Sequence, residues 1–152
     1  MDPIKQFRKE QQDNIRRLGR DKKLKALGLK FMVDSVGKNY SYNFDWLGRP
    51  IIQHPQDIIA MQELIWKIKP DLIIETGIAH GGSIIFSASM LELIGGNGNV
   101  LGIDIDIRKH NKAEIKKHRM YKRITMIEGS SIDDKVIKKV KAFARNKKRV
   151  LV

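Results

Sequence analysis

Small and acidic residues recur at three separated points of the chain, and their types could build one ligand site. Glu75 precedes Gly77 in a glycine-rich turn, Asp104 ends an apolar run, and Ser131 follows another such run. Glycine allows positive φ and close approach of a ligand to the backbone, while carboxylates and hydroxyls accept hydrogen bonds. These residues predict a site for a ligand with hydroxyl groups or positive charge, because Glu75 would repel a polyphosphate.

The glycine turn does not match the common nucleotide-binding motifs. Gly77 is followed by Ile-Ala-His, so the spacing differs from G-x-G-x-x-G and disfavours a dinucleotide site. Gly77 and Gly82 have the separation of a P-loop, but Ser83 stands where the phosphate-binding lysine belongs. We therefore expect neither a nicotinamide cofactor nor a nucleoside triphosphate in this turn.

S-adenosylmethionine combines the features that the residues favour, namely a sulfonium, an amino-acid tail and a ribose diol. Asp104 lies about 20 residues after Gly82, the distance at which a Rossmann-type unit places its ribose-binding acid. Its carboxylate can accept two hydrogen bonds from the diol, and Ser131 can reach the edge of the adenine. The residues alone thus indicate an adenosyl ligand at three neighbouring strand ends.

The elements that must position these residues alternate between strand and helix. Short apolar runs predict strands at 71–75, 100–104, 124–128 and 149–152, and helical spacing predicts helices at 57–69, 83–93, 108–119 and 133–145. Ser83 and Asp106 are expected to cap helices. Connection rules make the sheet parallel and its crossovers right-handed. The fold class is α/β, and ligands bind at the carboxyl ends of such strands.

The first 39 residues are predicted to be a basic helical extension, preceding a partial Rossmann-like domain at 40–152. Residues 2–30 carry an irregular apolar stripe among many Lys and Arg residues. The aromatic stretch 40–48 is expected to be a lid, an interface, a stacking platform or a loop pinned to the core. Residues 49–55 are predicted to be an extended connector, because residues before proline avoid the helical conformation.

The amino-acid composition does not decide which kind of partner, if any, the positive net charge serves. The chain has 152 residues, 41% hydrophobic residues, no cysteine and a net charge of +13. The absence of cysteine excludes disulfides and thiolate metal sites, and no stretch has the apolar length of a transmembrane helix or a secretion signal, so a cytoplasmic location is expected. The charge fits solvated helix faces, a nucleic-acid surface or an N-terminal membrane-surface helix. The alternative function is a nucleic-acid-binding or non-catalytic module.

Four motifs appear in order along the chain: N-F-D-W-L-G-R-P-I-I-Q-H-P-Q-D at 43–57, I-I-E-T-G-I-A-H-G-G-S at 73–83, L-G-I-D-I-D-I-R at 101–108 and I-E-G-S-S-I-D at 127–133. From residue 40 to residue 152 the chain resembles the cephalosporin hydroxylase/rhamnosyl O-methyltransferase family. The resemblance implies a class I S-adenosylmethionine-dependent O-methyltransferase that acts on a hydroxyl of a sugar or small molecule. In the sheet that it implies, the first strand is central, the next two lie on one side and the fourth lies on the other. The resemblance also implies cofactor contacts by Glu75, Gly77, His80, Ser83, Asp104 and Ser131.

The family is similar to methyltransferases in which Mg²⁺ acidifies the substrate hydroxyl. Its members continue past the fourth strand, where an Asp begins the metal site, whereas this sequence ends at Val152. The resemblance therefore implies a C-terminally truncated member, a fragment that lacks the metal ligands and the catalytic base. We expect such a chain to bind the cofactor weakly and to be inactive alone. We also expect it to self-associate, as a homo-oligomer or less specifically, through the exposed edge of its apolar sheet.

Overall fold

The computed structural model describes residues 2–152 and divides the chain into two compact units, Met1–Tyr40 and Ser41–Val152. The first unit contains helices α1 (Pro3–Arg20) and α2 (Lys22–Val36). Asp21 separates them, because its carboxylate accepts a hydrogen bond of 2.9 Å from the Leu24 N–H and so caps α2. The prediction of a single basic helix at 2–30 is therefore wrong, since this segment is divided between two helices.

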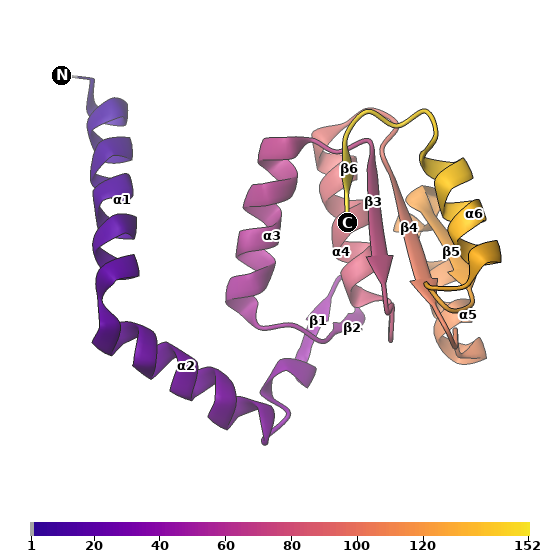
Figure 1. Ribbon diagram of the computed structural model, residues 1–152, viewed down its shortest axis with the longest axis horizontal. Helices are drawn as coiled ribbons and strands as arrows, with labels where there is room; N and C mark the ends of the chain where they lie inside the picture. The colour runs from indigo at the N-terminus through magenta and orange to yellow at the C-terminus, as the bar shows by residue number, and fades with distance from the viewer. Residues whose placement is uncertain (1) are drawn as a thin grey trace. The chain divides into compact units, whose positions relative to one another are not determined.

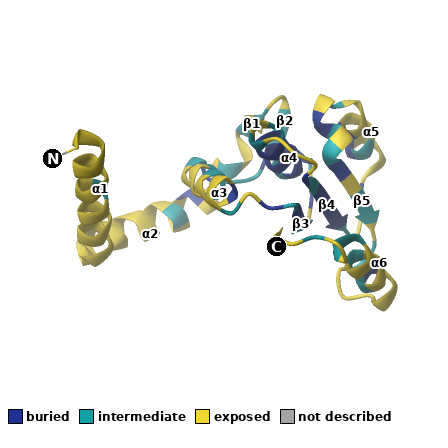
Figure 2. Cartoon of the chain, turned by 90° about the horizontal axis from the view of Figure 1, so that it is seen from above, coloured by how far each residue is buried: buried dark blue, intermediate teal, exposed yellow. Residues whose placement is uncertain are grey.

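Few side chains of the first unit are buried. Figure 2 shows α1 exposed over nearly all of its length, and α2 buries only Ser35. None of the helices within residues 2–152 has both the length and the apolar character needed to cross a bilayer.

The second unit is a parallel sheet with helices on both faces, as the sequence predicts (Figure 1). Its sheet has the strand order β5-β4-β3-β6, with β3 and β4 inside. The elements are η1 (Tyr40–Tyr42, which spans the boundary between the units), β1 (Phe44–Trp46), β2 (Arg49–Ile51), α3 (Pro55–Ile68), β3 (Leu72–Thr76), α4 (Gly82–Ile94), β4 (Asn99–Asp104), α5 (Lys109–Lys117), η2 (Arg119–Arg123), β5 (Ile124–Glu128), α6 (Asp134–Ala144) and β6 (Val150–Leu151).

Alternate residues of β3 and β4 face two different cores. Ile73 and Val100 pack with the buried residues of α4, while Leu72 and Leu101 pack with Val136 of α6. Because successive side chains of a strand point to opposite faces, Glu75 lies on the same face as Ile73, towards α4. The register pairs Glu75 with Gly102, so Asp104 lies on that same face two residues further along β4.

The aromatic stretch forms a β-hairpin that the sequence analysis did not predict. β1 and β2 pair antiparallel, and the turn between them places Leu47 at φ 49° and Gly48 at φ 82°. The Trp46 ring packs edge-on against Phe86 of α4 with centroids 4.9 Å apart, and its Nε1–H donates to Ser89 Oγ at 3.0 Å. The hairpin is thereby fixed to the helix that follows the glycine turn.

Two of the predicted helix caps are wrong. The N-cap of α4 is Gly81, in a left-handed conformation with φ 89°, and Ser83 lies inside the helix. The N-cap of α5 is Arg108 rather than Asp106. Both positions lie at the carboxyl edge of the sheet, where Ser83 donates to Glu75 and Asp106 pairs with Arg108.

Candidate functional site

Three adjoining cavities lie at the carboxyl ends of β3, β4 and β5. The first and second have volumes of about 410 Å³ each, and the third about 310 Å³. Gly77 lines the first and third cavities, His80 the first and second, and Asp104 the second and third. The shared walls make one continuous surface along the edge of the sheet that the sequence analysis predicted as the ligand site.

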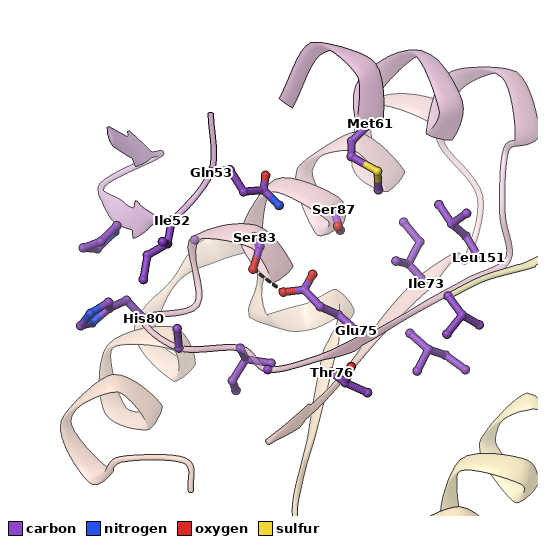
Figure 3. Close-up of a pocket in the computed structure, with 17 residues that line it drawn as sticks. Ile52, Gln53, Met61, Ile73, Glu75, Thr76, His80, Ser83, Ser87 and Leu151 are labelled. Atoms are coloured by element: carbon purple, nitrogen blue, oxygen red, sulfur yellow. Dashed lines mark hydrogen bonds between the residues drawn. The ribbon is translucent and has the colours of Figure 1, made fainter. Parts of the chain in front are cut away.

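Glu75 lines the first cavity from β3. Its carboxylate accepts a hydrogen bond from the Ser83 hydroxyl of α4 (Figure 3). Burial raises the pKa of Glu75 to about 7, and the hydrogen bond from Ser83 lowers it by a smaller amount. Near neutral pH, Glu75 is therefore divided between the neutral acid and the carboxylate, and a cation in the first cavity would favour the carboxylate.

The raised pKa of Glu75 predicts a loss of stability as pH rises. The folded state holds this proton up to about pH 7, and the unfolded chain releases it near pH 4.5, so the free energy of unfolding falls across that interval. The shift in pKa sets an upper limit of about 3 kcal/mol on this loss of unfolding free energy. The actual loss should be smaller, because Glu75 is only partly buried. Urea unfolding should show Glu75→Gln more stable than the wild type at pH 8 and not at pH 4.5. The exposed Glu63→Gln is the control, and equal stabilities at pH 8 would contradict the prediction.

Asp104 ties the glycine turn to the end of β4. Its Oδ2 accepts hydrogen bonds from the N–H groups of Ile78 and Ala79 at 2.8 and 3.4 Å, and its Oδ1 accepts one from Asp106 at 3.1 Å. Burial acts to raise the pKa of Asp104, but the backbone donors together outweigh it, and the pKa is lowered. Asp104 is therefore a carboxylate at neutral pH, and its remaining lone pairs face the second and third cavities.

The glycine turn has an unusual backbone that leaves room beside it. Gly77 has φ 83°, Ala79 has φ 42°, and the Gly77 N–H donates to the Ile103 carbonyl at 2.7 Å. Positive φ is costly for alanine, and such conformations cluster at ligand sites. A Cβ built at Gly77 would meet nothing within 4 Å, so the turn at this point is open to the cavities.

Gln53 is a site residue that the sequence analysis missed. It follows β2 and lines the first cavity near Glu75 and Ser83 (Figure 3). Its Oε1 is buried and has no hydrogen-bond partner among residues 2–152. A buried acceptor without a donor is costly. The group in the first cavity that suits the ammonium of S-adenosylmethionine is the carboxylate of Glu75, which lines the cavity beside Gln53.

The third cavity is lined by Ser131, which was predicted, and by Ile105, which the sequence analysis did not predict as a site residue. Ser131 is exposed at its rim, and Ile105, directly after Asp104, lines it with 74% of its surface exposed. The Gly129 N–H donates to the Asp104 carbonyl at 2.8 Å, which joins the ends of β4 and β5. The apolar side chain of Ile105 and the hydroxyl of Ser131 in one cavity would suit a flat heteroaromatic ring with a polar edge. The exposed apolar residue after a strand-ending acid was the available signal.

The predicted site residues therefore lie along one edge, distributed over the three cavities. Glu75, Gly77, His80 and Ser83 line the first, Asp104 the second and third, and Ser131 the third. Within residues 2–152, no group of three or more His, Cys, Asp or Glu residues could hold a metal ion. The described residues thus offer no ready-made cluster of three or more such ligands for Mg²⁺.

A family model described as Rhamnosyl O-methyltransferase/CmcI matches residues 38–152. The chain belongs to this family. A relative from Mycobacterium leprae (strain TN), the rhamnosyl O-methyltransferase, is 35% identical over 60 residues, which are 40% of this chain and 26% of that protein. The chain thus spans about a quarter of the length of this curated relative.

Solved structures of CmcI share the fold of this family member. An apo structure has a TM-score of 0.55 at 20% identity and covers 72% of this chain and 44% of CmcI. A structure of CmcI with Mg-SAM has a TM-score of 0.52 at 22% identity, over 64% of this chain and 40% of CmcI. At these identities the likeness establishes the α/β fold of the second unit alone.

Proposed function

We propose that the whole protein transfers a methyl group from S-adenosylmethionine to a hydroxyl of a sugar or small molecule, and that this chain supplies the cofactor half of the site. The observation that carries the proposal is the placement of Glu75 and Asp104. They lie on the same face of the sheet, at the carboxyl ends of its two inner strands and on either side of the glycine turn. Membership of the Rhamnosyl O-methyltransferase/CmcI family supports the reaction.

The first cavity would hold the amino-acid part of the cofactor. The carboxylate of Glu75 would accept a hydrogen bond from its ammonium. Its carboxylate would lie at the N-terminus of α4, beside Ser83, where the first backbone N–H groups have no partner within the helix. Gly77 would allow the cofactor to approach the backbone, and His80 would lie at the edge towards the second cavity.

The second and third cavities would hold the adenosine. Asp104, a carboxylate at neutral pH, would accept hydrogen bonds from the ribose diol. Ile105 would cover one side of the adenine ring, and Ser131 would contact its edge. Asp104 would then have two roles: it would bind the ribose, and it accepts hydrogen bonds from the N–H groups of Ile78 and Ala79.

The protein need not form a covalent bond in this reaction, and its main task is to align the cofactor's methyl group with the acceptor hydroxyl. When bound, S-adenosylmethionine supplies an electrophilic methyl group on a sulfonium. Residues of this chain would fix both ends of the cofactor and so hold the sulfur in one position, which converts an encounter of two molecules into an oriented reaction. We also propose that the Mg²⁺ expected for the family binds to residues of the whole protein outside this chain, where the base that deprotonates the hydroxyl would also lie.

Calorimetry tests the proposal and carries a pH prediction. S-adenosylmethionine should bind at pH 8, and NAD⁺ should give no heat. The affinity should fall between pH 8 and pH 6, because protonation of Glu75, whose pKa is about 7, removes the charge that pairs with the cofactor's ammonium. The fall should be less than about tenfold, since the cofactor's own α-amino group gains its proton over the same interval. Glu75→Gln should bind more weakly and with no such pH dependence. Binding of NAD⁺, or RNA binding with a steep salt dependence and no cofactor binding, would contradict the proposal.

A further inference from the structure

A polar cluster around the buried Asn111 holds the glycine turn, and the proposed cofactor contacts do not use Asn111 or Arg49. It consists of Arg49 at the start of β2, Asn111 in α5, and the backbone of Ala79 and His80. Asn111 is only 4% exposed, although its side chain is an amide. Buried amides must be hydrogen-bonded, so the partners of Asn111 identify its role.

Arg49 and Asn111 hold two successive carbonyl groups of the turn. Arg49 donates from Nε and Nη2 to the His80 carbonyl at 3.1 and 2.8 Å, and Asn111 donates from Nδ2 to the Ala79 carbonyl at 3.0 Å. Arg49 Nη2 also donates to Asn111 Oδ1 at 3.1 Å. Since Asp104 binds the turn's N–H groups from the other side, the positive φ of Ala79 is fixed from both directions.

These contacts permit only one orientation of the Asn111 amide. In the reverse orientation, the NH₂ group would face the N–H groups of Arg49, and the oxygen would face the Ala79 carbonyl. Two donors would then face each other at Arg49, and two acceptors would face each other at Ala79, which is unfavourable around a buried side chain. The oxygen of Asn111 therefore lies on the side of Arg49 and His80.

The orientation of Asn111 decides which nitrogen of His80 carries the proton. His80 Nδ1 lies 3.4 Å from Asn111 Oδ1, an atom that can only accept. A hydrogen bond between them requires Nδ1–H, and in the neutral imidazole Nε2 then keeps its lone pair. His80 lines the first and second cavities, and a donor group that reaches its Nε2 there would meet an acceptor and not a second donor.

We propose that Arg49 and Asn111 are positioning residues that fix the glycine turn and hold neutral His80 as its Nδ1–H tautomer, so that Nε2 accepts a hydrogen bond from a donor group of the cofactor. The tautomer follows from the cluster itself, whereas its use in cofactor binding rests on the proposed function. The donor groups available on S-adenosylmethionine and S-adenosylhomocysteine are the ammonium and the ribose hydroxyls.

Long-range ¹H–¹⁵N NMR of the histidine rings tests the tautomer directly in the wild-type chain, at a pH where the rings are neutral. We expect His80 to show the Nδ1–H pattern; an Nε2–H pattern would overturn the proposal. Asn111→Asp keeps an acceptor facing His80 and should keep the tautomer, whereas Asn111→Ala should lose it. The exposed Asn97→Ala is the matched control and should change neither His80 nor its spectrum.

Titration with S-adenosylhomocysteine supplies the second readout. Asn111→Ala should weaken binding about tenfold, and Asn97→Ala should leave it unchanged. An Asn111→Ala chain with wild-type affinity and an unchanged His80 tautomer would overturn the positioning role. If the wild-type chain shows the Nδ1–H tautomer and binds no S-adenosylhomocysteine, the result rejects the proposed function and leaves the tautomer assignment in place.

Discussion

Asp104→Ala should weaken the binding of S-adenosylhomocysteine about 100-fold. The substitution removes the acceptor of the ribose diol, and hydrogen bonds to a charged group contribute about 1.5 to 3 kcal/mol each. It also leaves the N–H groups of Ile78 and Ala79 without their acceptor, so the glycine turn loses one of the two sets of contacts that fix it. Calorimetry at pH 8 measures the loss.

Asp106→Ala is the matched control for Asp104→Ala. Asp106 lines the second cavity, is exposed, and carries the same charge two residues away. Its side chain forms a salt bridge of 3.9 Å with the exposed Arg108, and such pairs contribute little. If the general negative charge of this edge attracted the cofactor, both variants would bind about equally weakly, and the role assigned to Asp104 would be wrong.

The conservative variant Asp104→Asn separates the two tasks of Asp104. Its amide would keep one oxygen for the N–H groups of the turn, but an NH₂ group would replace an acceptor with a donor at the position of Oδ1, which binds the Asp106 N–H. We expect Asp104→Asn to fold like the wild type and to bind S-adenosylhomocysteine more weakly. Wild-type affinity in this variant would show that the charge of Asp104 is not used in binding.

The sheet could be predicted from the sequence because its signals are local. Each buried strand is a short apolar run bounded by turn residues, and connection rules restrict the order in which parallel strands can be arranged. The strand order β5-β4-β3-β6 agrees with the order that the family resemblance implies, and it brings Glu75 and Asp104 to one edge.

The rest of the site depends on contacts between distant parts of the chain. Gln53 and Asn111 have ordinary types and neighbours in the sequence, and their roles appear only when β2 and α5 pack beside the turn. Asp106 was predicted as a helix cap from its type alone, but the helix begins after Arg108. The hairpin was missed because its turn, Leu47–Gly48, lacks the Asn-Gly or Asp-Gly signal typical of such connections.

Gly82→Ala should destabilise the second unit by about 3 kcal/mol, as overpacking of a close contact does. Gly82 begins α4, and a Cβ there would lie 2.2 Å from the Pro50 carbonyl oxygen and 2.8 Å from the Ile51 Cα. Both atoms belong to the backbone of β2, so no side-chain rotation can relieve the clash. The hairpin must move away from α4, and Arg49, next to Pro50, must then lose its hydrogen bonds to the His80 carbonyl.

The indole N–H signals of the chain's two tryptophans make this displacement measurable. The Trp46 indole donates to Ser89 Oγ of α4, so its NMR signal should shift in Gly82→Ala, while that of Trp66, on α3, should not. Gly28→Ala is the control, because a Cβ there meets nothing within 4 Å and alanine favours the helix by about 1 kcal/mol. Since the clash also displaces Arg49, cofactor affinity should fall together with stability. A Gly82→Ala chain with wild-type unfolding and an unshifted Trp46 signal would mean that β2 does not rest on α4, and the positioning of the glycine turn by Arg49 would then have no structural basis.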